Sequence, residues 1–179
     1  MRKIFIFILS FILFTGCNNT LLNTPTKKVE MFFQNYQSLD KNVISQLNDV
    51  INNELTFTDD QRKEYLELMK RHYQSLKYNI KDEVIDGDQA VVTVEVEVMD
   101  YSRILNDADE YLKNNKDEFI KDGEYDISLF NDYRLKQLKK VNDKVKYTID
   151  LSLSKIDNEW ILDEISKETR DKINGIYIY

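Results

Sequence analysis

The sequence contains very little cysteine, histidine, proline or glycine, and each scarcity removes a class of protein. One cysteine in 179 residues excludes an internal disulfide framework. The sequence also contains only one histidine, which argues against a zinc site and against histidine-based catalysis. Four glycines and one proline argue against phosphate-binding loops, collagen-like repeats and long flexible linkers. We therefore expect no metal and no cofactor, and a domain that is stabilised by its hydrophobic core.

Acidic residues outnumber basic ones, 32 to 25, which gives a formal net charge of −7. If residues 1–16 are removed, two basic side chains and no acidic one are lost. The remainder then carries 23 basic and 32 acidic side chains, a net charge of −9. Such a protein is a poor candidate for binding nucleic acid or for electrostatic adhesion to anionic lipid.

The first sixteen residues have the pattern of a signal peptide. Arg2 and Lys3 precede an apolar run, Ile4 to Phe14, which is interrupted only by Ser10. This run is too short for a helix that crosses a hydrocarbon core of roughly 30 Å, which takes about 20 residues. We therefore interpret residues 1–16 as a secretion signal.

The residues Phe14-Thr-Gly-Cys17 resemble the lipobox of bacterial lipoproteins, although lipoboxes favour Leu, Val or Ile where Phe14 stands. The resemblance implies cleavage before Cys17, a diacylglyceryl thioether on its sulfur, and attachment to the outer side of the cell membrane. An uncleaved N-terminal anchor, or an ordinary signal peptide followed by a chance cysteine, is the alternative. Acylation explains a lone cysteine better, because an unpaired exported thiol is reactive.

Residues 17–26, with the only proline, are interpreted as a tether, and residues 27–179 as a single domain. Helical spacing of apolar residues predicts helices near 29–39, 43–51 and 60–76. Thr26 and one of Asp59 or Asp60 are the expected caps of the first and third helices. A short last helix, residues 167–173, is expected to begin after Ser166 and to stop at Gly175.

Alternating patterns predict two β-hairpins. Val92, Val94, Val96 and Val98 share one face of a strand, residues 90–101, that follows an Asp-Gly turn. A second hairpin is expected around Asp157-Asn158, with residues 145–153 on one side and 160–165 on the other. Between the hairpins, residues 103–142 return to helical spacing. The order of elements predicts an α+β fold, in which N-terminal helices cover one face of a curved antiparallel sheet of about four strands.

Three segments resemble the cone-shaped nuclear-transport-factor-two-like fold, which is found in secreted bacterial lipoproteins of unknown function. They are the helix at residues 29–40, the strand at 90–101 and the hairpin at 156–162, where Trp160 opens the last strand. The helical insertion departs from that family. The resemblance implies a cavity between sheet and helices. The aromatic residues that would line this cavity, or otherwise fill the core, are Phe32, Phe33, Tyr36, Tyr73, Tyr147 and Trp160.

These observations favour a lipid-anchored, non-enzymatic domain that binds an envelope protein or a small ligand. The alternative is a cone-pocket enzyme, an isomerase or dehydratase, that uses a buried carboxylate with tyrosines. Asp82 and Asp100 are its candidates, because they interrupt alternating strands, although solvation at strand ends explains them equally well. A third possibility is an interaction module, whose sign would be an exposed apolar patch on the insertion. We expect His72, which has no evident partner, at the surface or its boundary.

Overall fold

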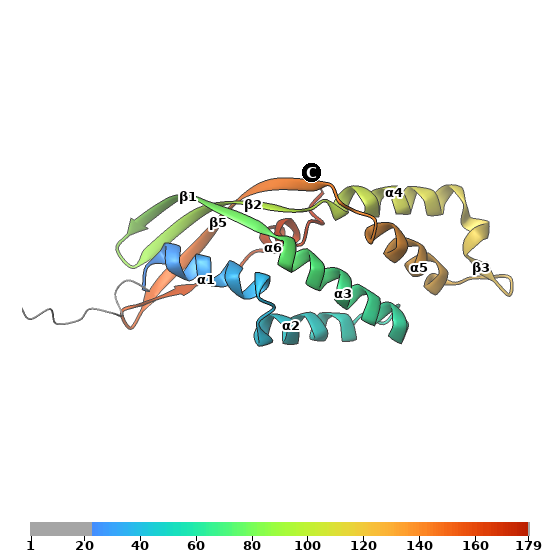
Figure 1. Cartoon of the computed structure of the whole chain (residues 1–179), viewed down its shortest axis with the longest axis horizontal. Coiled ribbons are helices and arrows are strands. Elements are labelled where there is room, and N and C mark those ends of the chain that lie inside the picture. The colour runs from blue at the N-terminus through green and yellow to red at the C-terminus, as the bar shows by residue number, and fades with distance from the viewer. Residues whose placement is uncertain (1–22, 179) are drawn as a thin grey trace, which may run out of the picture.

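Four antiparallel strands form the sheet on which the rest of the chain is arranged (Figure 1). The computed structural model describes residues 23–178, so the predicted signal peptide, Cys17 and residues 18–22 lie outside the described part. The elements and their bounds are α1 (Pro25–Gln37), α2 (Lys41–Asn52), α3 (Asp59–Ser75), β1 (Lys77–Asp86), β2 (Gln89–Met99), α4 (Tyr101–Asn114), η2 (Lys116–Phe119), β3 (Ile120–Lys121), β4 (Glu124–Tyr125), α5 (Ile127–Leu138), β5 (Lys144–Ile156), β6 (Glu159–Leu162) and α6 (Lys167–Ile173). The predicted α+β fold is confirmed.

The main sheet has the order β1-β2-β5-β6, so the two predicted hairpins lie side by side through β2 and β5. Val94 pairs with Ile149 across this central junction. The valines at even positions of β2, residues 92–98, are fully buried, whereas Glu95 and Glu97 lie on the opposite, open face. An antiparallel sheet allows this division, with one face against the core and one in water.

Helices α1 and α6 pack on the buried face of the sheet. Val29 and Phe33 of α1 are fully buried there, and Ile173 of α6 joins the same cluster. Thr24, rather than Thr26, caps α1, because Pro25 lacks an N–H and suits the first helical position. Residues 23–26, which the sequence analysis assigned to the tether, thus belong to the folded domain.

The helical insertion connects β2 to β5 and extends the molecule at one end (Figure 1). It contains α4, α5 and a small hairpin, β3–β4, that the sequence analysis did not predict. A second apolar cluster joins this insertion to α2 and α3 through Leu47, Ile51, Leu68, Tyr101 and Leu138. At the opposite end of the molecule lie the turns of the two long hairpins.

Helix caps decide where the other helices begin. Thr58 caps α3 in a reciprocal capping box with Gln61, so Asp59 and Asp60 occupy the first turn instead of capping it. Ser166 caps α6 as predicted, by accepting a hydrogen bond from the backbone N–H of Thr169.

Candidate functional site

The structure distributes the six predicted pocket residues over two environments. Phe33, Tyr147 and Trp160 are buried in the core between sheet and helices, and Phe32 packs against that core. Phe33 stacks on Tyr78 with ring centroids 4.8 Å apart, which fills the space beneath α1. None of these four residues lines either of the two cavities described below.

Tyr36 and Tyr73 come together on one wall of a small cavity of about 160 Å³ between α1, α2, α3 and α6. Their rings meet edge to face, with centroids 4.8 Å apart. The hydroxyl of Tyr73 donates to the Asn174 side chain at 3.3 Å. Burial raises the pKa of both tyrosines, so both hydroxyls are protonated at neutral pH.

A larger cavity of about 260 Å³ lies within the helical half of the molecule. Its walls are formed by the helices α2, α3, α4 and α5, by the loop after α2 and by the segment after α6, and they are mostly apolar. The lining residues are Val50, Ile51, Glu54, Thr56, Phe57, Tyr65, Leu68, Met69, Tyr101, Leu105, Asn131, Arg134, Leu135, Leu138 and Ile176. Helix α2 forms one wall with little packing of its own, since Leu47 and Ile51 are its only buried residues. Val50 of this helix is 66% exposed.

Two buried donor groups at this cavity have no acceptor within the described chain. One is the hydroxyl of Tyr101, a residue that is only 2% exposed, and the other is the Arg134 Nε. The Arg71 guanidinium lies beside the Tyr101 oxygen, but it is a donor and leaves the hydroxyl proton without an acceptor. Burial raises the pKa of the Tyr101 hydroxyl, and the nearby Arg71 guanidinium partly opposes this rise. A buried donor without an acceptor costs about 1–3 kcal/mol. An occupant with suitable acceptors would remove that cost.

This cavity was not predicted, although the sequence of α5 contains a pattern that indicates it. Asn131 and Arg134 recur at helical spacing with Leu135 and Leu138, which places polar residues on an otherwise apolar face. Asn131 is 2% exposed, and its side-chain amide donates to the Thr56 carbonyl at 3.0 Å. This bond ties α5 to the loop after α2.

The prediction that His72 lies at the surface is wrong. His72 is fully buried, and its Nε2 lies 2.8 Å from the Ile173 carbonyl oxygen. The ring of Tyr101 packs beside it at 5.1 Å between centroids. Helix α6 and the start of α4 cover this side of α3, and both lie far from His72 in the sequence. Its Nδ1 has no hydrogen-bond partner in the described chain, and its neighbours offer no catalytic partner.

Asp82 and Asp100, the carboxylates of the enzyme hypothesis, both have local structural roles. Asp82 is exposed at a β-bulge, where the register with β2 shifts after Ile80. Asp100 is half-buried and caps α4, accepting from the Ser102 hydroxyl at 2.8 Å. Among residues 23–178 no Asp or Glu is buried.

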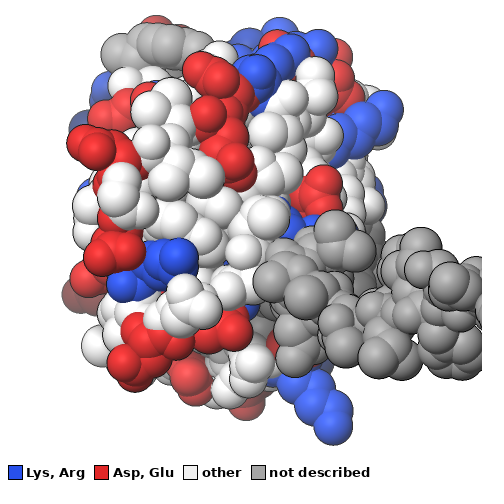
Figure 2. Space-filling model, turned by 90° about the vertical axis from the view of Figure 1, so that its left-hand side faces the viewer, with Lys and Arg blue, Asp and Glu red and all other residues white. Residues whose placement is uncertain are grey.

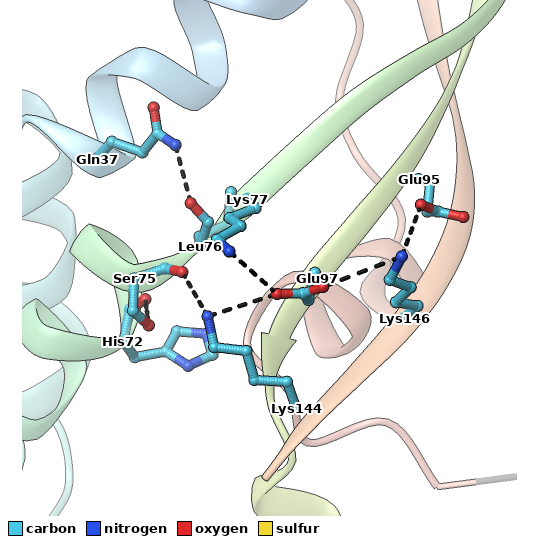
Figure 3. A network of polar contacts seen from close by, with 9 residues as sticks. All are labelled: Gln37, His72, Ser75, Leu76, Lys77, Glu95, Glu97, Lys144 and Lys146. Atoms are coloured by element: carbon cyan, nitrogen blue, oxygen red, sulfur yellow. Dashed lines mark hydrogen bonds and ion pairs between the residues drawn. The ribbon is translucent and has the colours of Figure 1, made fainter. Parts of the chain in front are cut away.

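A ladder of ion pairs crosses the open face of the sheet near α3 (Figure 3). Glu97 lies 3.6–4.0 Å from Lys77, Lys144 and Lys146, and Glu95 lies 3.3 Å from Lys146. The Lys146 ammonium lowers the pKa of Glu95 below its ordinary value. Because these cations and carboxylates already have partners, the ladder is a cross-strand contact between β1, β2 and β5 rather than a vacant site.

The insertion carries some exposed apolar surface on its small hairpin. Ile120, Tyr125 and Ile127 are 38–48% exposed there. Side chains exposed to this extent are normal on soluble domains and do not mark an interface by themselves. The described residues contain no group of three or more potential metal ligands. Within residues 23–178, no helix has the length and hydrophobicity needed to cross a membrane.

Comparisons with known proteins identify no family for this chain. No protein-family model matches the sequence, and no curated protein matches it. Among solved structures, the crystal structure of ycdA, a candidate lipoprotein from Bacillus subtilis, shares a partial likeness with a TM-score of 0.47 and 15% sequence identity. The likeness covers 76% of this chain and 46% of ycdA, so the chain spans less than half of that protein. A likeness of this degree carries no information about function. None of these comparisons tests the nuclear-transport-factor-two-like resemblance, which stays a prediction.

Proposed function

We propose that the protein is a lipid-anchored, extracytoplasmic binding protein that holds a small, largely apolar ligand between its helices. The observation that carries the proposal is the cavity of about 260 Å³ whose wall includes the buried Tyr101 hydroxyl, which has no acceptor in the described chain. Ligand sites are typically apolar cavities with a few polar groups that fix orientation. This cavity has that composition.

The start of the described chain determines which end of the domain an anchor on Cys17 would hold near the membrane. The Asn23 side chain donates to the Asn158 carbonyl at 2.8 Å and accepts from the Trp160 backbone N–H at 2.9 Å. The described chain therefore starts at the β5–β6 turn. Six residue steps from Cys17 to Asn23 span at most about 20 Å. A lipid on Cys17 would hold the hairpin end near the bilayer, with the helical half and its cavity farther out.

Acidic side chains (red) stand among basic ones (blue) on the hairpin end of the molecule, as Figure 2 shows. Asp86 and Asp88 flank the β1–β2 turn, and Asp157 and Glu159 lie at the β5–β6 turn. Negative charge there opposes adhesion to anionic lipid. We therefore propose a domain that is tethered beside the membrane without lying on it.

The enzyme alternative has less support. An isomerase or dehydratase of the expected kind needs a buried carboxylate beside a tyrosine. Asp82 is exposed and Asp100 is a helix cap, and the cavity's one carboxylate, Glu54, is exposed as well. Binding without chemistry needs none of these groups.

Lipidation predicts a defined modified N-terminus. We expect protein from bacterial membranes to begin at Cys17 and to carry the mass of a diacylglyceryl group, as measured by intact-mass spectrometry. A Cys17→Ser variant should incorporate no labelled fatty acid, because the sequence has no other cysteine. Recovery of an unmodified Cys17, or of a chain that still begins at Met1, would contradict the anchor.

Filling the cavity should abolish ligand binding without unfolding the protein. Leu105 is half-buried on α4 and lines the cavity. We expect Leu105→Phe to weaken the binding of the neutral probes octanol and phenylbutanol by at least about tenfold, since the larger ring occupies their space. Amide NMR titration of residues 17–179 carrying Cys17→Ser measures this. Leu112→Phe, on the same helix but outside the cavity, is the matched control. Equal binding by both variants would refute the assigned site.

A further inference from the structure

We infer that the ligand is a small amphipathic carboxylate, whose anionic group pairs with Arg134 while its apolar body fills the cavity. This inference rests on the proposed binding function and adds to it the charge of the ligand. Its basis is the contrast between the one cation and the one carboxylate that line the cavity.

Arg134 is the only basic residue among the cavity's lining residues. Its guanidinium carries a permanent charge and five N–H donors. No carboxylate of residues 23–178 forms an ion pair with it, and its Nε is buried without an acceptor. The guanidinium lies over the ring of Phe130, with its central carbon 5.5 Å from the ring centroid. A positioned guanidinium whose Nε lacks an acceptor suits a planar carboxylate, which can accept from Nε and from one terminal nitrogen through two parallel hydrogen bonds.

Glu54 is the group that would oppose an anion or attract a cation. However, its carboxylate already accepts from the Thr56 hydroxyl at 2.8 Å and from the Thr56 backbone N–H at 3.2 Å. Glu54 is also exposed, so water satisfies and screens it. The cavity-lining groups that lack a partner are therefore hydrogen-bond donors, which need an acceptor from the ligand.

The size of the cavity limits the apolar part of the ligand. A dry cavity of about 150 Å³ holds one benzene molecule. At about 260 Å³, this cavity accommodates a body somewhat larger than a benzene ring, such as a phenylalkyl or medium-length alkyl chain. The Tyr101 hydroxyl offers a second donor to an acceptor atom of the ligand.

A charge series on fixed apolar bodies tests the inference. The probes are octanoate, octanol and octylamine, and phenylbutyrate, phenylbutanol and phenylbutylamine, titrated by amide NMR into residues 17–179 carrying Cys17→Ser. We expect each carboxylate to bind at least about tenfold more tightly than its alcohol, with shifts centred on α2 and α5, and each amine to bind more weakly still.

Arg134→Gln should remove this preference. We expect it to weaken carboxylate binding about tenfold and to change alcohol binding by less than twofold. Lys136→Gln, an exposed cation on the same helix that does not line the cavity, should change neither. Equal affinities for carboxylate and alcohol, or a preference for the amine, would overturn the inference and leave the binding site intact. If no probe shifts the cavity residues, both the inference and the proposed function fall.

Discussion

Gly175→Ala is expected to destabilise the protein by about 3 kcal/mol or more, a large share of the 5–15 kcal/mol that typically stabilises a domain. Gly175 follows α6 with a φ of +69°, a conformation that costs other residues roughly 1–2 kcal/mol. A β-carbon there would lie 2.0 Å from the Met99 carbonyl oxygen. Because that oxygen belongs to the backbone of β2, the segment itself would have to move.

Movement of this segment breaks the junction between α6 and α4. The Gly175 carbonyl accepts hydrogen bonds from the backbone N–H groups of Tyr101 and Ser102, both at 2.9 Å. Each lost bond costs about 1 kcal/mol. Tyr101 and Ile176 also line the large cavity, so we expect the same variant to weaken ligand binding.

Gly87→Ala is the matched control, measured with Gly175→Ala by urea unfolding. Gly87 has a φ of +59°, but a β-carbon there would meet no atom within 4 Å. Only the conformational cost of about 1 kcal/mol applies. Equal losses of stability in the two variants would show that the close approach at Met99 does not matter.

Local patterns predicted the sheet and its connections well. The alternating valines of β2 fixed which face of the sheet is buried, and the Asp-Gly and Asp-Asn turns located both hairpins. Even Asp82, which interrupts the alternation of β1, marks a real irregularity, the bulge after Ile80. These features depend on neighbours in sequence or on one strand partner, so periodicity reveals them.

The candidate site depends on contacts between distant segments, which periodicity does not reveal. Tyr101, Arg134 and Ile176 meet at the cavity only because α6 returns to the start of α4. The same return of α6 buries His72. In the sequence of α3, His72 is only a polar residue between Arg71 and Tyr73, so its burial against Ile173 could not be predicted. Aromatic residues near the sheet were recognised as core or pocket, but composition alone does not separate a filled core from an open one.

Acid is expected to destabilise the protein through His72, with a loss of about 3 kcal/mol between pH 7 and pH 4. Burial lowers the pKa of His72 from 6.5 to about 4; the hydrogen bond to the Ile173 carbonyl opposes this shift, and the Lys144 ammonium adds to it. Above pH 6.5 the imidazole is neutral in both states and has no effect. Below pH 6.5 His72 binds a proton in the unfolded chain but not in the folded protein. The free energy of unfolding therefore decreases until the pH reaches the folded-state pKa of about 4.

His72→Gln isolates this effect from the titration of the carboxylates. A glutamine amide can donate to the Ile173 carbonyl in place of Nε2 and does not titrate between pH 4 and pH 7. We expect the free energy of unfolding of the wild type, relative to this variant, to decrease by about 3 kcal/mol over that range, mostly between pH 6 and pH 4. A difference that does not change with pH would mean that His72 has the same pKa in the folded and unfolded protein, which requires water or an acceptor at Nδ1. Because His72 packs against Tyr101, such hydration would also extend to a residue of the cavity wall.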